Sequence, residues 1–208
     1  MVITHYGNQF FKLQFGDMVV ALNPISKESS FKPSRFGADI CLVSANHPDL
    51  NGTDQLGFGD KQPFVISGPG EYEIKGIFVK GFPSKSTYGG KDISNTVYLL
   101  NLDSINICFL GAIGTSEIPA ELKEAVGEVD ILFVPIGGNG TLVAADAYKL
   151  AVKFEPKAII PMGFDSASLK TFLKEGGDES VKPIDKLTVK RKDLEGKEGE
   201  VIILASAI

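Results

Sequence analysis

The chain has 208 residues, 43% hydrophobic and 23% charged, which is ordinary for a globular protein and predicts one domain spanning residues 1–208. The formal net charge of −5 argues against a nucleic-acid partner, because phosphate binding needs clustered lysines and arginines. No apolar run approaches the ~20 residues that cross a bilayer, and the N-terminus lacks the pattern of a signal peptide. Cys41 and Cys108 lie within apolar runs as reduced core thiols would, so we expect a cytoplasmic protein without a membrane anchor.

The first half of the chain predicts strands joined by tight turns. Polar and apolar residues alternate over 11–15, a turn follows at 16–17, and an apolar run covers 18–22, which is typical of a hairpin. The other strands expected in this half span 38–43, 64–67, 77–82, 96–102 and 105–110.

The second half alternates strands with helices. Ser116 can cap a helix that ends at Gly127, and Thr141 can cap a second helix that reaches Phe154. A third helix is expected over 166–174, and strands over 129–136, 157–161, 187–190 and 200–205. Hairpins followed by alternating strands and helices favour layered sheets with outer helices over a simple doubly wound sheet.

A polar loop follows the strand at 38–43 and has the sequence Ser44-Ala-Asn-His-Pro-Asp-Leu50. Together with segments 68–76, 129–138 and 156–162, this loop resembles the metallo-β-lactamase superfamily, in particular a small bacterial branch of Zn-dependent hydrolases. The resemblance extends over nearly the whole chain. It implies an α/β fold, a four-layer αββα sandwich in which helices cover the outer faces of two central sheets.

The motif loop keeps only part of the metal-ligand pattern that this resemblance implies. The family pattern His-x-His-x-Asp-His falls on residues 45–50, where His47 and Asp49 match. Ala45 and Leu50 replace the outer two histidines, and neither side chain has a donor atom for a metal. Because a catalytic zinc site needs about three protein ligands, the loop alone is insufficient.

The other corners of the implied site show the same loss. Ala112 stands where the family has its bridging carboxylate, and Gly163 stands where this branch has a late histidine. Asn8 replaces a frequent histidine, Asn23 replaces a usual aspartate, and the loop at 83–86 contains no histidine. We therefore predict no metal cofactor, although the family implies zinc and weak binding of a single metal stays open.

These substitutions predict a non-catalytic binding or assembly protein with a degenerate metal site. Its partner is unknown, and pairing with a second copy or with a paralogue stays open. The alternative is a metal-dependent hydrolase with a rearranged mononuclear site at His47, Asp49 and Asp165, acting on a phosphodiester or an ester. We interpret His47 and Asp49 as vestigial candidates for catalysis. The former metal pocket is expected to be lined by Asn46, His47, Asp49, Ala112 and Gly163.

Three aromatic residues at or near the former metal corners, Phe82, Phe109 and Phe164, are expected to fill that pocket. The glycine-rich segment 137–141 could hold an anion at a helix N-terminus, but a tight turn is the favoured interpretation. Ser44, His47 and Asp49 are the residue types of a catalytic triad, yet their crowding in one loop makes relay geometry improbable.

Overall fold

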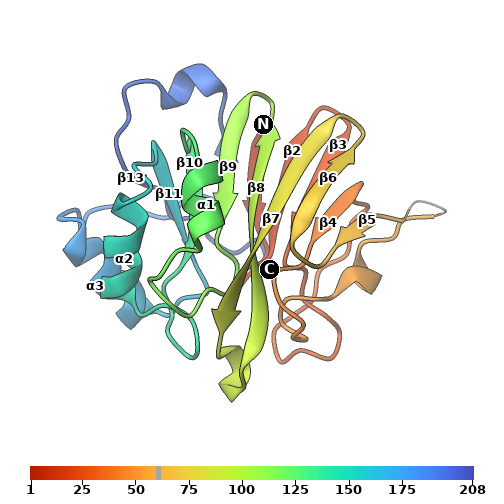
Figure 1. Cartoon of the computed structure of the whole chain (residues 1–208), viewed down its shortest axis with the longest axis horizontal. Helices are drawn as coiled ribbons and strands as arrows, with labels where there is room; N and C mark the ends of the chain where they lie inside the picture. Colours follow the sequence, from red (N-terminus) through yellow and green to blue (C-terminus); the bar gives the residue numbers. More distant parts are fainter. Residues whose placement is uncertain (60–61) are drawn as a thin grey trace.

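A computed structural model describes residues 1–59 and 62–208, and its strands form two sheets packed face to face (Figure 1). The first sheet has the order β12 (Leu187–Thr188), β1 (Val2–His5), β2 (Phe11–Phe15), β3 (Met18–Leu22), β4 (Ile40–Leu42) and β5 (Phe64–Ile66). The second sheet has the order β13 (Glu200–Val201), β11 (Ala158–Met162), β10 (Ile131–Pro135), β9 (Ile105–Phe109), β8 (Ile93–Leu102), β7 (Ile77–Ser86) and β6 (Gly70–Ile74). The predicted layered-sheet arrangement is confirmed.

Both sheets combine antiparallel hairpins with parallel strands. The predicted β2–β3 hairpin is present, with Phe15 opposite Met18 and Gly16 in the left-handed region at φ 56°. Strands β3, β4 and β5 run parallel, as do β9, β10, β11 and β13. Binding groups gather where parallel strands end, so the loops after β4, β10 and β11 are the natural places for a site.

The core between the sheets is built by alternate side chains of the facing strands. Phe11 of the first sheet packs edge-on against Phe133 of the second, with ring centroids 5.0 Å apart. Tyr98 is completely buried and donates its hydroxyl hydrogen to the carbonyl oxygen of Val43 at 2.8 Å, which ties the second sheet to the end of β4. Phe109 belongs to this inner core.

The three α-helices, α1 (Ala120–Ala125), α2 (Ala144–Val152) and α3 (Ser166–Glu175), lie together on the outer face of the second sheet (Figure 1). Leu150 of α2 and Phe172 of α3 share one buried cluster with Leu132 of β10. The outer face of the first sheet is covered by loop residues, among them Ile25 and Leu56, and by the short 3-10 helix η1 (Thr53–Gln55). This is the expected sandwich, with a loop-built layer over the first sheet.

Two predicted helix caps differ from the structure. Helix α1 starts at Ala120, directly after Pro119, and no side chain caps it, so Ser116 lies outside the helix. A proline is well suited to a helix start because its fixed φ and missing N–H cost nothing there. Thr141 instead donates its hydroxyl hydrogen to the Gly138 carbonyl oxygen, and α2 begins three residues later. Helix α3 has a capping box, in which Asp165 and Ser168 bond each other's backbone N–H.

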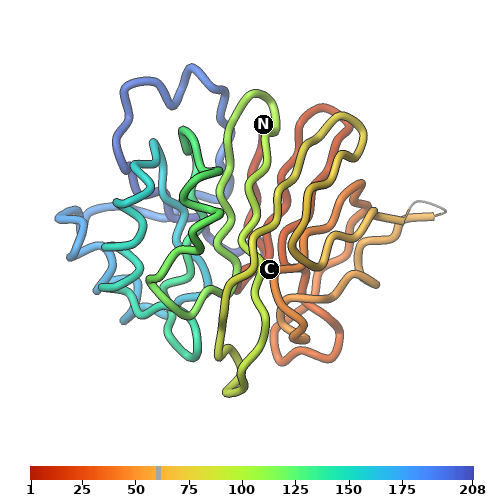
Figure 2. Tube along the Cα trace, viewed as in Figure 1, coloured from red at the N-terminus to blue at the C-terminus, as the bar shows by residue number. Residues whose placement is uncertain are grey.

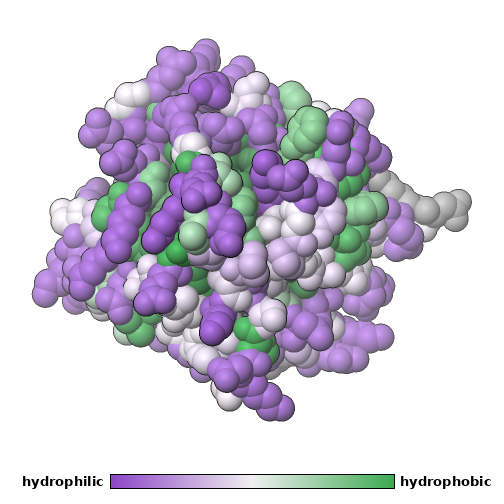
Figure 3. All heavy atoms as spheres, viewed as in Figure 1, coloured by the Kyte–Doolittle hydropathy of each residue, from purple (hydrophilic) through white to green (hydrophobic). Residues whose placement is uncertain are grey.

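Polar side chains cover most of the face seen in Figure 3, and apolar ones appear there in small separate patches. The described helices, α1 to α3 among them, are too short or too polar to span a bilayer. The trace in Figure 2 shows the β7–β8 hairpin reaching past the ends of the neighbouring strands. This extension carries one of the side chains that form the site.

Buried His5 makes stability depend on pH. Its ring stacks on Phe11 with centroids 4.6 Å apart, and its nitrogens lie 3.0 and 3.1 Å from the carbonyl oxygens of Leu204 and Asn8. Burial lowers the pKa of His5 below its ordinary 6.5. Below that value the unfolded chain therefore binds more protons at this position than the folded chain, so the contribution of His5 to stability falls as the pH drops from 6.5 towards the folded pKa.

We expect the difference in unfolding free energy between the wild type and His5→Gln to be constant above pH 6.5 and to shrink at lower pH. The slope cannot exceed about 1.4 kcal/mol per pH unit for one proton. Urea titrations of both proteins from pH 5 to pH 8 measure it. A difference that stays flat across this range would show that His5 titrates alike in the folded and unfolded chains.

Candidate functional site

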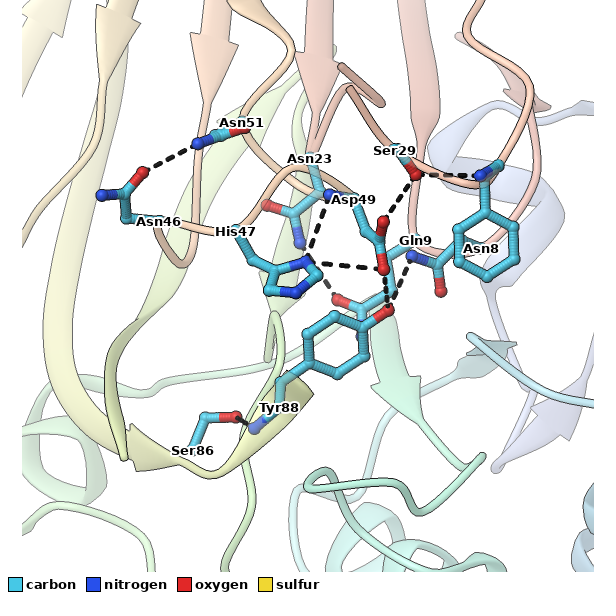
Figure 4. A network of polar contacts seen from close by, with 11 residues as sticks. Asn8, Gln9, Asn23, Ser29, Asn46, His47, Asp49, Asn51, Ser86 and Tyr88 are labelled. Atoms are coloured by element: carbon cyan, nitrogen blue, oxygen red, sulfur yellow. Dashed lines mark hydrogen bonds and ion pairs between the residues drawn. The ribbon is translucent and has the colours of Figure 1, made fainter. Parts of the chain in front are cut away.

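Four segments from distant parts of the sequence meet at the ends of the strands (Figure 4). They are the turn after β1, the loop after β3, the loop after β4 and the tip of the β7–β8 hairpin. Hydrogen bonds that link side chains from all four converge on the carboxylate of Asp49 or on its immediate partners. This cluster is the candidate site.

The Asp49 carboxylate is mostly buried and has a partner on each oxygen. Ser29 donates its hydroxyl hydrogen to Oδ1 at 2.5 Å, and Tyr88 donates its phenol hydrogen to Oδ2 at 2.8 Å. His47 Nδ1 lies 3.5 Å from Oδ2 and accepts a hydrogen bond from the Asp49 backbone N–H at 3.2 Å. In this contact Nδ1 is the hydrogen-bond acceptor, and its lone pair is directed at the Asp49 backbone N–H.

Tyr88 begins the 3-10 helix η2 (Tyr88–Gly90) at the hairpin tip and is itself buried. Its oxygen accepts a hydrogen bond from Asn8 Nδ2 at 3.2 Å, and its ring meets the ring of His47 edge-on, with centroids 4.9 Å apart. Burial raises the pKa of Tyr88 well above its usual range, and the hydrogen bond to Asp49 raises it further. The phenol therefore keeps its proton at neutral pH and acts as a donor towards Asp49.

Three of the positions at which the sequence predicts lost metal ligands share a buried cluster with Tyr88. Ala45, Leu50 and Ala112 form a buried apolar cluster with Tyr88, and Ile93 packs against it. The expectation that phenylalanines fill this space is wrong. Phe109 lies in the core between the sheets, and Phe82 and Phe164 pack on the helix-covered side.

Neutral amide groups cross-link the loops that frame the site. Asn23 is completely buried in a left-handed conformation, and its Oδ1 accepts from the Ser44 N–H at 2.8 Å. Its Nδ2 donates to Gln9 Oε1 and to Ser44 Oγ. Asn95 Oδ1 accepts from the Ala112 N–H at 2.7 Å. Side-chain hydrogen bonds thus fix the loops around positions 23 and 112, where the family has acidic residues.

The remaining predicted site residues lie at the margin of the cluster. Gly163 donates its N–H to the Asn8 carbonyl oxygen at 2.9 Å, which places the loop after β11 beside the turn after β1. Asn46 is exposed and bonds Asn51, turned away from Asp49 (Figure 4). Asp165 is engaged with Ser168 at the start of α3. The predicted use of Asp165 beside His47 and Asp49 has no support in these contacts.

The donor set determines which metal centre the site can hold. Among residues 1–59 and 62–208, no group of three or more His, Cys, Asp or Glu side chains lies close enough together to share an ion. His47 and Asp49 are two strong donors that face one another, and the nearby oxygens of Ser29 and Tyr88 are neutral. These residues do not fit a two-metal centre. For a single ion they supply two of the about three protein ligands of a catalytic zinc site, so its other ligands would have to be water, substrate or a neutral oxygen of the cluster.

Sequence reasoning found His47 and Asp49 but missed Ser29 and Tyr88. Ser29 lies 20 residues before Asp49 and Tyr88 lies 39 residues after it. Both are in polar loops, where the sequence has no hydrophobic periodicity that would predict the conformation. Asn8 was singled out only as a replaced ligand, although its side chain binds Tyr88.

The two-sheet sandwich with a polar site at its strand ends has the architecture of the metallo-β-lactamases and their relatives. The family model described as "Beta-lactamase superfamily domain" matches residues 2–163, and the chain belongs to this superfamily. The predicted superfamily and fold are thereby confirmed.

Several named proteins are similar to this chain. A UPF0173 metal-dependent hydrolase of Thermococcus kodakarensis is 23% identical over 177 residues, which cover 73% of this chain and 79% of the relative. Its counterpart in Carboxydothermus hydrogenoformans is 25% identical over 195 residues, covering 80% and 85%. A crystal structure from Thermotoga maritima, of a proposed Zn-dependent hydrolase of the metallo-β-lactamase superfamily, matches with a TM-score of 0.76 and 26% identity over 98% of this chain and 97% of that one.

These names correct one prediction. The relatives are called metal-dependent, and this contradicts the prediction that the chain lacks a metal cofactor. The prediction counted lost ligand positions and gave too little weight to the pair that remains, His47 and Asp49, which the fold keeps 3.5 Å apart.

Proposed function

We propose that the chain is a metal-dependent hydrolase with a rearranged mononuclear site at His47 and Asp49, acting on an ester or a phosphodiester. The observation that carries this proposal is the approach of His47 Nδ1 to within 3.5 Å of Asp49 Oδ2, in a site that also holds the hydroxyl groups of Ser29 and Tyr88. The names of the relatives support a metal-dependent hydrolysis.

Each residue of the cluster has a distinct part in this proposal. His47 Nδ1 and Asp49 Oδ2 would hold the ion, and a bound divalent metal supplies hydroxide near neutral pH by lowering the pKa of its water. Ser29 holds Asp49 Oδ1 and so fixes the direction of the carboxylate. Asn8 Nδ2–H is a donor within the same cluster and can stabilise negative charge on a substrate oxygen.

The proposal is tested by metal analysis together with a substrate screen. Protein purified without chelator is titrated with Zn²⁺ or Mn²⁺ and assayed on neutral aryl esters and on aryl phosphodiesters. We expect one ion per chain and turnover that rises with occupancy and disappears with chelation. Asn46→Ala is the matched control, because this exposed motif residue lies outside the cluster and its loss leaves turnover unchanged. Two ions per chain, or no turnover at saturating metal, would contradict the proposal.

A non-catalytic binding or assembly role is the second candidate, and the packing around Tyr88 favours it. The ring fills the space between Ala45, Leu50 and Ala112, which leaves little room for a substrate in this conformation. Absence of turnover combined with stable co-purification of a second copy or a paralogue, measured by native mass spectrometry, would support this role against the first.

A further inference from the structure

Two sets of contacts hold the tip of the β7–β8 hairpin against the rest of the molecule. Strand pairing ends at Ser86 opposite Ile93, and the tip beyond it exposes Thr87, Gly89 and Gly90. One set consists of hydrogen bonds to the Gly140 carbonyl oxygen, which accepts from the Thr87 N–H at 3.1 Å and from Ser86 Oγ at 3.2 Å. The other is the side chain of Tyr88, which is the buried group of the tip.

The space that the Tyr88 side chain occupies has two chemically different ends. The ring is surrounded by the aliphatic groups of Ala45, Leu50 and Ala112, with the edge of His47 on one side. The hydroxyl meets one strong acceptor, Asp49 Oδ2 at 2.8 Å, and one donor, Asn8 Nδ2 at 3.2 Å. Figure 4 shows the phenol pointing at this pair. The surroundings are thus complementary to a flat apolar ring with one hydroxyl group.

We propose that Tyr88 is a lid and that the space it fills is the binding site for a small neutral ring carrying a hydroxyl group. The inference deepens the proposed function by naming the part of a substrate that lies beside His47 and Asp49. A ring without the hydroxyl leaves Asp49 Oδ2 without the donor that Tyr88 supplies and Asn8 Nδ2 without its acceptor, which is unfavourable. A ring with a negative group is repelled by the charge of Asp49.

The closed position of Tyr88 depends on the two glycines that follow it. Gly89 and Gly90 have φ values of 74° and 80°, a region that other residues rarely adopt. A Cβ atom on Gly89 would lie 2.7 Å from His47 Nε2, so the closed tip also needs glycine for space. In the closed state a ligand must displace the phenol, and its apparent affinity is therefore reduced by the fraction of molecules that are open.

The test uses phenol as the probe and the variant Tyr88→Gly. This variant lacks the ring, so the space that the ring fills in the wild type becomes open. Calorimetry compares phenol with toluene, which lacks the hydroxyl, and with benzoate, which is anionic. We expect Tyr88→Gly to bind phenol at least tenfold more tightly than either control compound. The wild type and Tyr88→Phe, in which a ring still fills the space, are expected to bind phenol at least tenfold more weakly than Tyr88→Gly. This measurement requires neither metal nor turnover. The lid proposal can therefore fail while the proposed function holds, and the proposed function can fail while the lid proposal holds.

Two results would overturn the proposal. One is a folded Tyr88→Gly protein that binds toluene as tightly as phenol or binds neither compound. The other is a wild type that binds phenol as tightly as the variant, since no lid would then be present. If Tyr88→Gly does not fold, Tyr88→Ala is measured against the same criteria. In the wild type, phenol near its solubility limit is expected to shift the amide signals of Tyr88, Gly89 and Gly90 in NMR spectra, and unchanged signals there count against the lid.

Discussion

Asp49→Asn is expected to lower hydrolytic activity at least 100-fold and to weaken metal binding at least tenfold, with little change in volume. The substitution removes the negative charge that would hold the ion and replaces one carboxylate oxygen by an amide nitrogen that cannot ligate it. Ser29 and Tyr88 both donate to this carboxylate, so the amide also meets a donor where an acceptor is required. Calorimetric metal titration and turnover of the best substrate from the screen measure the two effects.

A third readout of the same variant does not depend on metal. The pKa of Tyr88 is raised first by burial and then by its hydrogen bond to Asp49 and the charge of that residue. Removing the charge should move the tyrosine pKa downwards, while burial still holds it above its usual range. Ser29→Ala is the matched control, because it removes one hydrogen bond to Asp49 and keeps the charge. Full activity in Asp49→Asn, or a Tyr88 titration identical to that of the wild type, would show that Asp49 does not control the site.

The sequence was sufficient to place the strands because their signals are local. Alternation over Phe11–Phe15 and the glycine turn at Gly16 predicted a hairpin whose observed register has Phe15 opposite Met18. The apolar runs at Ile131–Pro135 and Ala158–Met162 are completely buried parallel strands, as their composition indicated. Helix starts were less predictable, since hydroxyl residues such as Thr141 bond turns as readily as they cap helices.

The site was only partly predictable because its members meet through tertiary contacts. The motif spacing identified His47 and Asp49, which lie together in the site, and Ala45, Leu50 and Ala112, which form an apolar cluster beside them. It carried no information on what replaces the lost ligands. That is decided by the hairpin tip, which brings Tyr88 across 39 residues of sequence to Asp49. A motif therefore indicates which residue types occupy the expected ligand positions, whereas it does not indicate which side chains from distant segments pack against them.

Gly137→Ala is expected to destabilise the fold by roughly 3 kcal/mol or more, the range of severe overpacking between groups that cannot move apart. Gly137 follows β10, and a Cβ atom there would overlap with the backbone carbonyl oxygen of Gly163, which follows β11. Because backbone stands against backbone, no side-chain rotation relieves the overlap. Gly127→Ala is the control, since the space around Gly127 is open, and its unfolding free energy should stay within about 0.5 kcal/mol of the wild type.

The same substitution connects stability to the site. Gly163 donates its N–H to the Asn8 carbonyl oxygen, and the Asn8 side chain donates to Tyr88, so a displaced β11 loop moves the donors around Asp49. The fraction of Gly137→Ala that remains folded at low temperature is therefore expected to bind metal more weakly than Gly127→Ala, with urea denaturation and calorimetry as the measurements. Wild-type stability in Gly137→Ala would mean that the two loops lie further apart than this packing requires. Gly163 would then be required chiefly for its left-handed φ of 62°, and no close approach of the two loops would be needed to explain it.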